Sequence, residues 1–556
     1  MTSTTPPARH PTASHPTASH LTASHPAASH PTGGHLTGTA TLVRLALRRD
    51  RIKSPLWLIA ITVMVPRFHY AAATVVAPTP EARAEAAQMI KASFMRVLAG
   101  PVFGERAVTS QSYFLAAYWV EFLLAAALMN ILLITRHTRA EERTGRTELV
   151  RAAVVGRHAQ LTAALVVAVA ADAALAVLVA AAAIGVGFPA AGALLFGASL
   201  AAAGLVFAAA TAVTAQLTEQ PRAAAGIAGA ALFASWITRG AGALQDQEGG
   251  PLFWLSPIGW SQQTRVLAGD RWWPLGLSVL LTALLAAGAY HLAGRRDLGA
   301  ALLAARPGRA AGPSWLRSPL ALAWRLQQSA IGWWAAALLA AGLAMGGMAG
   351  GMVGIDLDIF PAGADVVRGW LSLLVFTGSL CAAVFALLSV SRLRAEEARG
   401  LVGPVLAGPV GRSAWFAASF LVTGIGVVAL LTVYGAGLGL GAAVSTGEPG
   451  LVAEVVGAAL LRLPEVLVLL AVPAALFGLA PRAMAAAWAV FLYSAFVQVF
   501  GPYAGVPAWL TGTSVLSHLP WHPLGAFAPV ATAVLTVLAA PLFLLGRYGL
   551  RRRDLA

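Results

Sequence analysis

The stretch Arg139-Ala-Glu-Glu-Arg-Thr-Gly-Arg-Thr-Glu-Leu-Val-Arg-Ala-Ala-Val-Val-Gly-Arg157 lies between two long apolar runs. A second copy, Arg394-Ala-Glu-Glu-Ala-Arg-Gly-Leu-Val-Gly-Pro-Val-Leu-Ala-Gly-Pro-Val-Gly-Arg412, begins 255 positions later, again between apolar runs, and ten of the 19 aligned residues are identical. A repeat at this distance indicates that one structural unit occurs twice in the chain. A shorter match agrees with this interpretation, because Arg295-Arg296-Asp297-Leu298 recurs as Arg552-Arg553-Asp554-Leu555.

The composition places the chain in a lipid bilayer. Of its 556 residues 58% are hydrophobic and 11% are charged, and the mean hydropathy is +0.73. A soluble domain carries about 25% charged residues, so this chain has too few to cover a water-facing surface. The net charge of +15 comes from arginines in short segments between apolar runs, which requires no nucleic-acid partner. The single cysteine, Cys381, excludes a disulfide within the chain and a cysteine-based metal site.

A membrane-spanning helix needs about 20 mostly apolar residues, and each half of the chain offers six such runs. We predict spans at 55–76, 112–135, 159–184, 190–217, 223–243 and 274–293, and at 330–351, 369–390, 414–443, 453–479, 483–500 and 525–546. Lys and Arg number 28 on the side of the N-terminus and 8 on the other side, which predicts cytoplasmic termini in the plasma membrane. The expected fold is an all-α polytopic membrane protein with about twelve transmembrane helices in two tandem six-helix repeats, a pseudo-dimer.

The expected domains follow from these runs. Residues 1–38 form a tail rich in His, Pro, Ser, Thr and Ala, 39–298 the first membrane unit, 299–313 a cytoplasmic linker and 314–556 the second unit. Six histidines recur every five residues from His10 to His35. Such a composition predicts disorder, and the alternative is a weak metal-binding tail. Each unit is expected to begin with a helix on the membrane surface, at 39–54 and at 314–328.

The repeated loop has the pattern of a charged helix, a glycine stop and a second short helix. Glu142 has the spacing to pair with Arg139 and with Arg146 on one helix face. Gly145 and Gly400 are expected helix stops, because glycine accepts the left-handed conformation after a helix end. Arginines alone would be explained by anionic headgroups, but paired glutamates would be repelled by them. We therefore favour docking of a soluble partner at both loops.

The loop motif resembles permeases of ATP-binding-cassette exporters of the type-2 class, and the duplicated form is similar to the actinobacterial exporters of polyketide antibiotics. The resemblance covers about residues 40–556. It implies that each loop is a coupling helix that contacts an ATPase subunit. The implied residues are Arg139, Glu141, Glu142, Gly145, Glu148, Gly156 and Arg157, and Arg394, Glu396, Glu397, Gly400, Gly411 and Arg412. The second copy departs from the first, since Gly403 replaces Glu148 and Pro404 and Pro409 intrude, which predicts a shorter or bent helix there.

The chain itself has no site for ATP hydrolysis. A phosphate-binding loop needs glycines before a Lys-Ser or Lys-Thr pair. Lys53 is followed by Ser54 without a nearby glycine, and Lys91 is followed by Ala92. ATP and Mg are therefore expected on a separate ATPase chain, with two copies for each permease, and the permease is not expected to be an enzyme. The cargo implied by the resemblance is a hydrophobic or amphipathic drug or antibiotic, such as a polyketide.

Charged residues inside the spans are candidates for a substrate pathway. They are Glu121, Asp172, Arg462 and Glu465. Arg462 and Glu465 flank Pro464 and would neutralise each other on a kinked tenth span, whereas Glu121 is expected near the outer end of its span. The alternative function is an ion-coupled secondary multidrug transporter with parallel repeats, in which Glu121, Asp172 or Glu465 would carry protons. A membrane-embedded enzyme has no catalytic or metal-binding residues to support it.

Overall fold

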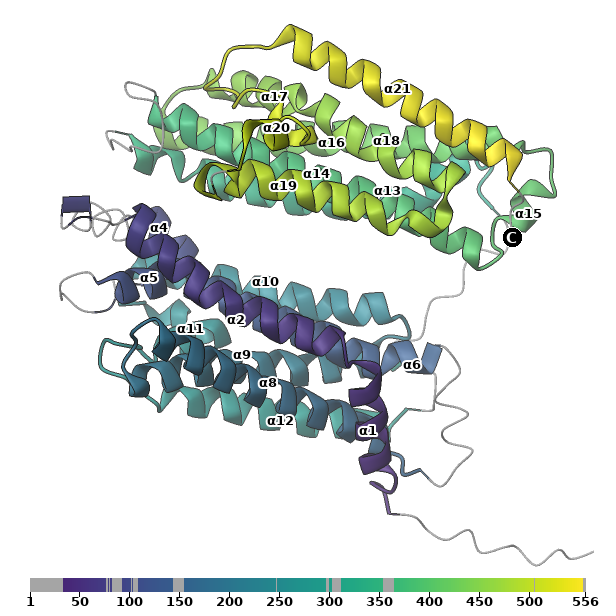
Figure 1. The fold of residues 1–556 in the computed structure, drawn as a ribbon. Coiled ribbons are helices and arrows are strands. Elements are labelled where there is room, and N and C mark those ends of the chain that lie inside the picture. Colours follow the sequence, from purple (N-terminus) through teal and green to yellow (C-terminus); the bar gives the residue numbers. More distant parts are fainter. Residues whose placement is uncertain are drawn as a thin grey trace, which may run out of the picture. The chain divides into compact units, whose positions relative to one another are not determined.

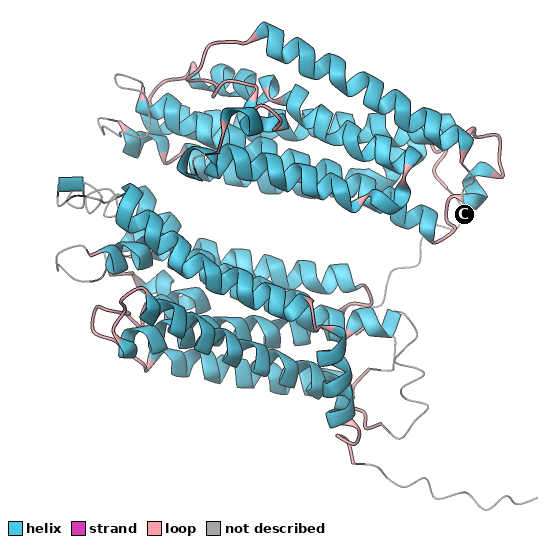
Figure 2. Ribbon diagram, viewed as in Figure 1, coloured by secondary structure: helices cyan, strands magenta, loops and turns pink. Residues whose placement is uncertain are grey.

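A computed structural model describes residues 34–76, 79, 81–82, 93–101, 103, 109–143, 155–246, 248–296, 300–302, 312–353, 365–504 and 506–553. Within these ranges the secondary structure is helical throughout, without a strand (Figure 2). The chain divides into two compact units, one of residues 1–91 and 95–306 and the other of 92–94 and 307–556 (Figure 1). The predicted all-α polytopic membrane fold is confirmed.

Eleven long apolar helices are able to cross a membrane, among the described residues. The first unit supplies α2 (Lys53–Ala71), α5 (Ser110–His137), α8 (Ala159–Gly185), α9 (Ala190–Leu217), α10 (Pro221–Gln245) and α12 (Pro274–Gly294). The second supplies α13 (Pro319–Gly346), α14 (Val366–Ala398), α16 (Arg412–Thr446), α17 (Leu451–Leu461) joined to α18 (Leu463–Leu479), and α21 (Pro529–Arg552). The twelfth predicted span falls on α19 (Ala485–Ala504), whose described apolar part, Ala485–Val499, is shorter.

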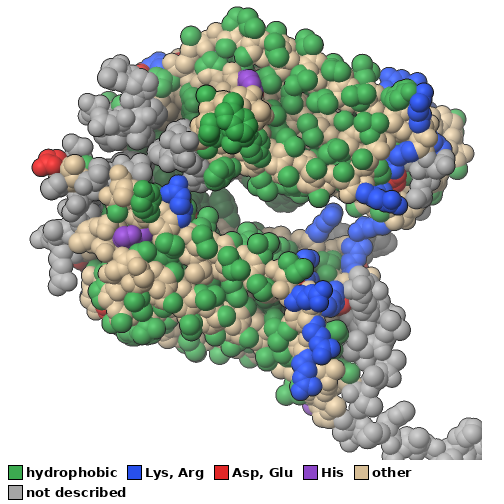
Figure 3. All heavy atoms as spheres, viewed as in Figure 1, with side chains coloured by type: hydrophobic (Ala, Val, Ile, Leu, Met, Phe, Trp, Pro, Cys, Tyr) green, Lys and Arg blue, Asp and Glu red, His purple; other side chains and the backbone are tan. Residues whose placement is uncertain are grey.

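The remaining elements are short. They are α1 (Thr39–Arg49), η1 (Ala72–Val76), α4 (Ser93–Ala99), α6 (Arg139–Arg143), η2 (Pro251–Leu255), α11 (Pro257–Gln262), η3 (Ala349–Met352), α15 (Gly403–Leu406), η4 (Pro481–Ala483), α20 (Ala508–Thr511) and η5 (Val515–Ser517). Apolar side chains cover the flanks of both units in Figure 3, as expected for surfaces that face lipid. Lys and Arg side chains gather at the end of the first unit that holds α1 and at the end of the second that holds α15.

In the first unit, helix α9 is central and packs on α5, α8 and α12. Its sequence is dominated by Ala and Gly, and small side chains let neighbouring backbones approach closely in a membrane. A Cβ at Gly197 of α9 would overlap the backbone carbonyl of Ala176 in α8. At one end of the α5–α9 interface, the rings of Phe114, Phe122 and Phe196 pack edge to face.

In the second unit, two helix pairs pack with almost no space between their backbones. Helix α13 lies against α16, where a Cβ at Gly346 would overlap the carbonyl oxygen of Leu438. Helix α18 lies against α21, where a Cβ at Gly478 would overlap the carbonyl oxygen of Gly546. These contacts require glycine, because any side chain would force the helices apart.

The predicted surface helix at 39–54 corresponds to α1, which ends before the turn at Asp50. The separate helix expected at 314–328 is not present, because residues 319–328 are the first turns of α13, which continues to Gly346. The side chain of Ser318 caps this helix and Pro319 occupies its first turn, both of which favour a helix start. The helix continues without a break through Gly332 and Gly342 to Gly346, so surface segment and span form one element.

Candidate functional site

The repeated loop begins in both units as a charged helix end. In the first unit, α5 ends at His137 and α6 carries Glu141 and Glu142. In the second unit, α14 runs through the corresponding glutamates without a break and ends at Ala398. Gly145, Arg146 and Glu148 lie outside the described residues, so the first copy is seen only at its entry and exit.

Gly400 stops helix α14 as predicted. Its φ is 71°, in the left-handed region that glycine accepts without strain. The N–H of Gly400 donates to the carbonyl of Glu397 (2.9 Å) and the N–H of Leu401 to that of Glu396 (3.1 Å). These two bonds satisfy carbonyls that the helix end would leave without partners. The chain then forms α15, a helix of only four residues with Pro404 in its first turn.

Glu142 is held by two arginines, which we call the first cluster. The Nη1 of Arg139 donates to Oε2 of Glu142 at 2.7 Å, confirming the pair predicted from their spacing. Arg296, which follows the last helix α12, binds both carboxylate oxygens, with Nη2 to Oε1 at 2.6 Å and Nη1 to Oε2 at 3.1 Å. Such bidentate pairs are among the strongest hydrogen bonds in proteins. The Glu142 side chain is only 6% exposed.

The same arginines reach the end of α9. Arg139 donates to the carbonyl oxygens of Ala215 and Gln216, which belong to the last turn of that helix. Arg296 donates through Nε to the side-chain oxygen of Gln216 at 2.6 Å. Cations are favourable at a helix C-terminus, where carbonyls lack partners. The first cluster therefore joins the ends of α6, α9 and α12.

Glu397 of the second unit has the same partners at corresponding positions, which we call the second cluster. Arg394 pairs with Oε2 of Glu397 at 2.9 Å, and Nη1 of Arg553 lies 2.7 Å from Oε1. The guanidinium of Arg553 stacks over the ring of Phe477 in α18, with its carbon 5.1 Å from the centroid. The Glu397 side chain is 1% exposed. Nε and Nη2 of Arg553 have no hydrogen-bond partner, so this cluster is less complete than the first.

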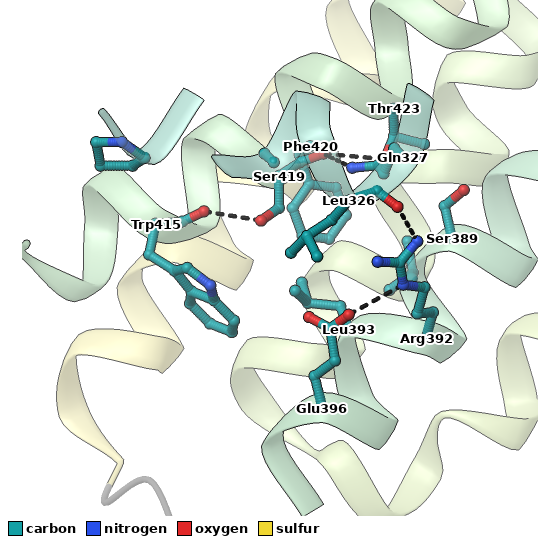
Figure 4. A pocket seen from close by; sticks show the side chains of 13 residues that line it. Leu326, Gln327, Ser389, Arg392, Leu393, Glu396, Trp415, Ser419, Phe420 and Thr423 are labelled. Atoms are coloured by element: carbon teal, nitrogen blue, oxygen red, sulfur yellow. Dashed lines mark hydrogen bonds and ion pairs between the residues drawn. The ribbon is translucent and has the colours of Figure 1, made fainter. Parts of the chain in front are cut away.

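The other glutamate of each pair faces the first helices of its unit. Glu141 forms an ion pair with Arg49 of α1. Glu396 accepts from Nε of Arg392 at 2.9 Å, and Arg392 also donates to the carbonyl oxygen of Leu326 in α13. Figure 4 shows this chain of contacts beside a small cavity of about 30 Å³. The two adjacent glutamates of each loop therefore bind different partners.

Arg157 and Arg412, at the exits of the two loops, hold the same helix ends. Arg157 donates through Nη2 to the carbonyl oxygens of Gly294 (2.6 Å) and Arg296 (3.2 Å). Arg412 donates through Nη1 to the carbonyl oxygen of Arg553 at 2.9 Å. Two of the residues that are identical in the two loop copies, the second glutamate and the exit arginine, thus bind one arginine in each unit. Gly411 precedes α16 as its N-cap residue and has open space around it.

Gly156 packs against the base of the N-terminal tail. Its N–H donates to the carbonyl oxygen of Thr37 at 2.9 Å, and the N–H of His158 donates to that of His35 at 3.0 Å. A Cβ at Gly156 would overlap the backbone of His35. The predicted tail of residues 1–38 therefore includes, at 34–38, a segment that is packed on the loop exit. Residues 1–33 lie outside the described part of the chain.

Sequence reasoning missed the role of Asp50, which joins the turn after α1 to the end of α5. Its carboxylate accepts from Nη1 of Arg136 at 2.7 Å and lies 2.8 Å from Nε2 of His137. Burial works to raise the pKa of Asp50, but hydrogen bonds from Arg136 and His137 outweigh burial and hold the pKa below its usual value. The sequence did offer a signal for this role, because Asp50 is the one acidic residue among five basic ones in 44–53.

Arg462 and Glu465 form the predicted pair inside the tenth span. Nη1 of Arg462 lies 3.2 Å from both carboxylate oxygens, and both side chains are fully buried. The span is interrupted between α17 and α18 at Arg462, two residues before Pro464, as expected for a kink. Arg462 also donates to the carbonyl oxygen of Pro520 at 3.0 Å. Protein groups therefore hold both charges, although Nε of Arg462 has no hydrogen-bond partner.

Asp172 is fully buried between α8 and its neighbours. Its Oδ1 accepts from Nδ2 of Asn130 in α5 at 2.8 Å, whereas Oδ2 has no hydrogen-bond partner. Gly204 of α9 faces this pair, and a Cβ there would lie 2.5 Å from Oδ1. The arrangement is a polar contact in an otherwise apolar interface.

Two further charged residues lie within long helices of the first unit. Glu121 lies eleven residues after the start of α5 and is exposed on the surface of that helix. Arg239, which falls within the predicted span 223–243, is buried inside α10. Its Nη2 donates to the carbonyl oxygens of Val97 (2.6 Å) and Leu98 (2.8 Å). These carbonyls accept hydrogen bonds from a buried charge inside the span.

Comparison with known proteins agrees with a membrane permease. The family model described as "Multidrug efflux system permease Rv1217c, C-terminal domain" matches residues 316–551. The "Multidrug efflux system permease protein Rv1217c" of Mycobacterium tuberculosis is 36% identical over 531 residues, which cover 93% of this chain and 95% of that protein. The similarity therefore extends through both units.

Proposed function

Because this chain belongs to the family of the multidrug efflux system permease Rv1217c, we propose that it is the membrane-spanning permease of an ATP-driven exporter of hydrophobic or amphipathic drugs. Polyketide antibiotics are the cargo class that its loop motif suggests, and their export would confer antibiotic resistance. ATP and Mg are bound by a separate ATPase, with one copy at each of the loops 139–157 and 394–412. The observation that carries the proposal is the pair of buried Arg–Glu–Arg clusters at the feet of these loops.

In the second unit the exposed side chains of the loop show what a partner would contact. Leu401 is 57% exposed, and Arg399, Pro404 and Pro409 are also exposed, whereas Glu397 is buried. A partner would therefore meet an apolar tip with one cationic neighbour. The paired glutamates that first suggested docking are occupied by arginines of this chain. We infer that these glutamates hold the loop to its own unit, beneath the surface that the partner contacts.

An apolar groove of about 1050 Å³ in the second unit fits the proposed cargo in size and chemistry. It is lined by α13, α16, α18 and α21, including Leu421, Leu467 and Phe543, and its walls are almost entirely apolar. Drug-sized ligands occupy sites of about 300–1,000 Å³ with mainly hydrophobic walls. Arg462 and Glu465 do not line it. The groove is a better candidate for drug contact than the buried charges are.

The test is reconstitution of the chain in proteoliposomes with and without its ATPase. We expect drug-stimulated ATP hydrolysis and drug uptake only when both chains and ATP are present. Transport driven by a pH gradient in the absence of the ATPase would overturn the proposal.

That second outcome would favour the ion-coupled transporter. The specific observation behind this alternative is Asp172, a buried carboxyl group with one oxygen unpartnered. An ionised carboxylate is costly in such a place, so a proton carried there would be stabilised.

A further inference from the structure

Glu142 and Glu397 are not accessible to a second protein, and each is bound by two arginines of its own unit. One arginine lies on the helix that enters the loop, and the other follows or ends the last helix of the unit. We propose that the two clusters are transmission joints, each of which passes a displacement of its loop to the last helix, α12 or α21. The inference rests on the proposed function, in which an ATPase acts on the loops.

The geometry holds each loop at both its ends. At the loop entry, Glu142 binds the guanidinium of Arg296, and at the loop exit Arg157 binds the carbonyl oxygen of the same residue. In the second unit, Glu397 binds the guanidinium of Arg553 and Arg412 binds its carbonyl oxygen. A loop attached at entry and exit to one residue cannot shift without moving it.

The joint is stiff because it is buried. An arginine guanidinium is a planar fork that fits a carboxylate in one orientation, so the bidentate pair of Arg296 and Glu142 resists rotation. Pulling the pair apart would leave uncompensated charges in a largely buried place, which is strongly unfavourable. The last helix therefore follows the loop more readily than the pair separates.

The two joints are not equal. The first has a bidentate pair and a further bond from Arg296 to Gln216 of α9. In the second, Arg553 makes one ion-pair contact with Glu397 and leaves Nε and Nη2 without hydrogen-bond partners. We expect the first joint to transmit more of a loop movement than the second.

The chain offers matched controls, because Arg296 and Arg553 each have an exposed arginine immediately before them. Arg295 precedes Arg296, and Arg552, which stacks over Tyr548 at 4.3 Å, precedes Arg553. Arg295→Met and Arg552→Met remove the same charge from the same helix end without touching either glutamate. A difference in behaviour between the variants of two adjacent arginines is therefore caused by loss of the cluster and not by loss of one positive charge.

The experiment compares Arg296→Met and Arg553→Met with these controls in proteoliposomes that contain the ATPase. The measurements are ATPase retained by pull-down, basal hydrolysis, drug-stimulated hydrolysis and drug transported per ATP. We expect Arg296→Met to retain the ATPase but to lower transport per ATP by at least about fivefold, the low end of typical coupling factors. Arg296→Lys should recover part of the loss, because it keeps the charge, and Arg553→Met should be milder than Arg296→Met.

Two results would overturn the inference. One is wild-type transport per ATP in both methionine variants. The other is an equal loss of ATPase binding, hydrolysis and transport in proportion to the folded protein, which would mean that the clusters only stabilise the fold. If the methionine variants do not insert into the membrane, Glu142→Gln, which preserves side-chain shape, is tested instead. The quantity measured is again the drug transported per ATP. Failure of the proposed function looks different, since the wild-type chain would then neither retain the ATPase nor stimulate it.

Discussion

Glu142 and Arg296 are 154 positions apart in the sequence, yet their side chains meet in a bidentate ion pair with distances of 2.6 and 3.1 Å. The contact joins the foot of a loop to the end of the last helix of the unit. It is the reason that the two glutamates of the loop, although adjacent, have different roles.

Charge reversal should separate these roles. Glu142→Arg would place a third cation beside Arg139 and Arg296 in a buried site, which should destabilise the protein by about 3–5 kcal/mol. Glu141→Arg should cost about 1 kcal/mol or less, because its pair with Arg49 is more exposed. Thermal unfolding of the purified protein in detergent measures both. Equal midpoints for the two variants would contradict the buried cluster.

The packing of α18 on α21 should not tolerate a methyl group. Gly478→Ala introduces a Cβ that overlaps the carbonyl oxygen of Gly546, so we expect a loss of about 1–3 kcal/mol. Gly457→Ala is the matched control, because no atom lies within 4 Å of a Cβ at that position. The midpoints of thermal unfolding should differ in that order, and a harmless Gly478→Ala would refute the close contact.

Asp50 should make stability depend on acid. Its pKa is lower in the folded chain than the usual value of 3.8, because the bonds from Arg136 and His137 outweigh burial. The stabilisation is complete above pH 3.8 and is lost as the pH falls through the folded pKa. Asp50→Asn should flatten the dependence of the unfolding midpoint on pH in this range. An unchanged slope in the variant would show that other carboxylates cause it.

Asp172→Asn distinguishes the two transport mechanisms. In the ATP-driven exporter this nearly isosteric change should leave drug transport within about twofold of wild type, because Asn130 can still bond to the amide. In an ion-coupled transporter it would abolish the response to a pH gradient. Drug uptake with ATP and with an imposed gradient, measured side by side, decides between them.

Deletions at the N-terminus should have a sharp boundary. Removal of residues 2–33 is expected to leave stability and transport unchanged, because such a composition contributes little to packing. Removal of residues 2–38 also deletes the bonds to Gly156 and His158 and should cost about 1–2 kcal/mol. The comparison of unfolding midpoints tests this. Equal midpoints would mean that the segment 34–38 contributes nothing.

Interactions that depend on local spacing were predictable from the sequence. The stop at Gly400, the pair of Arg139 and Glu142 and the pair of Arg462 and Glu465 all involve residues within one or two helical turns. Hydropathy likewise located eleven of the twelve predicted spans in long helices, because transfer of about 20 apolar residues into lipid dominates their placement.

Interactions between distant segments were not predictable in this way. The repeated loop and the repeated Arg-Arg-Asp-Leu segment, which supply the cluster residues, were both visible in the sequence. Nothing in the sequence alone related Glu142 to Arg296. The carbonyls of Val97 and Leu98 that accept from Arg239 likewise come from a segment about 140 positions away, so no local pattern relates them to it. The segment 314–328 was predicted as a separate surface helix because its arginines and tryptophans resemble one. A helix stop between this segment and the following span would have been needed to divide the two.

The glycine contacts of the second unit limit how it can deform. With no room for a methyl group between α13 and α16, or between α18 and α21, each pair is expected to behave as a single rigid body. The unit then has few independent moving parts, and a passage for cargo would open along the seams between the pairs and not within them. The apolar groove, which borders on helices of both pairs, lies along such a seam.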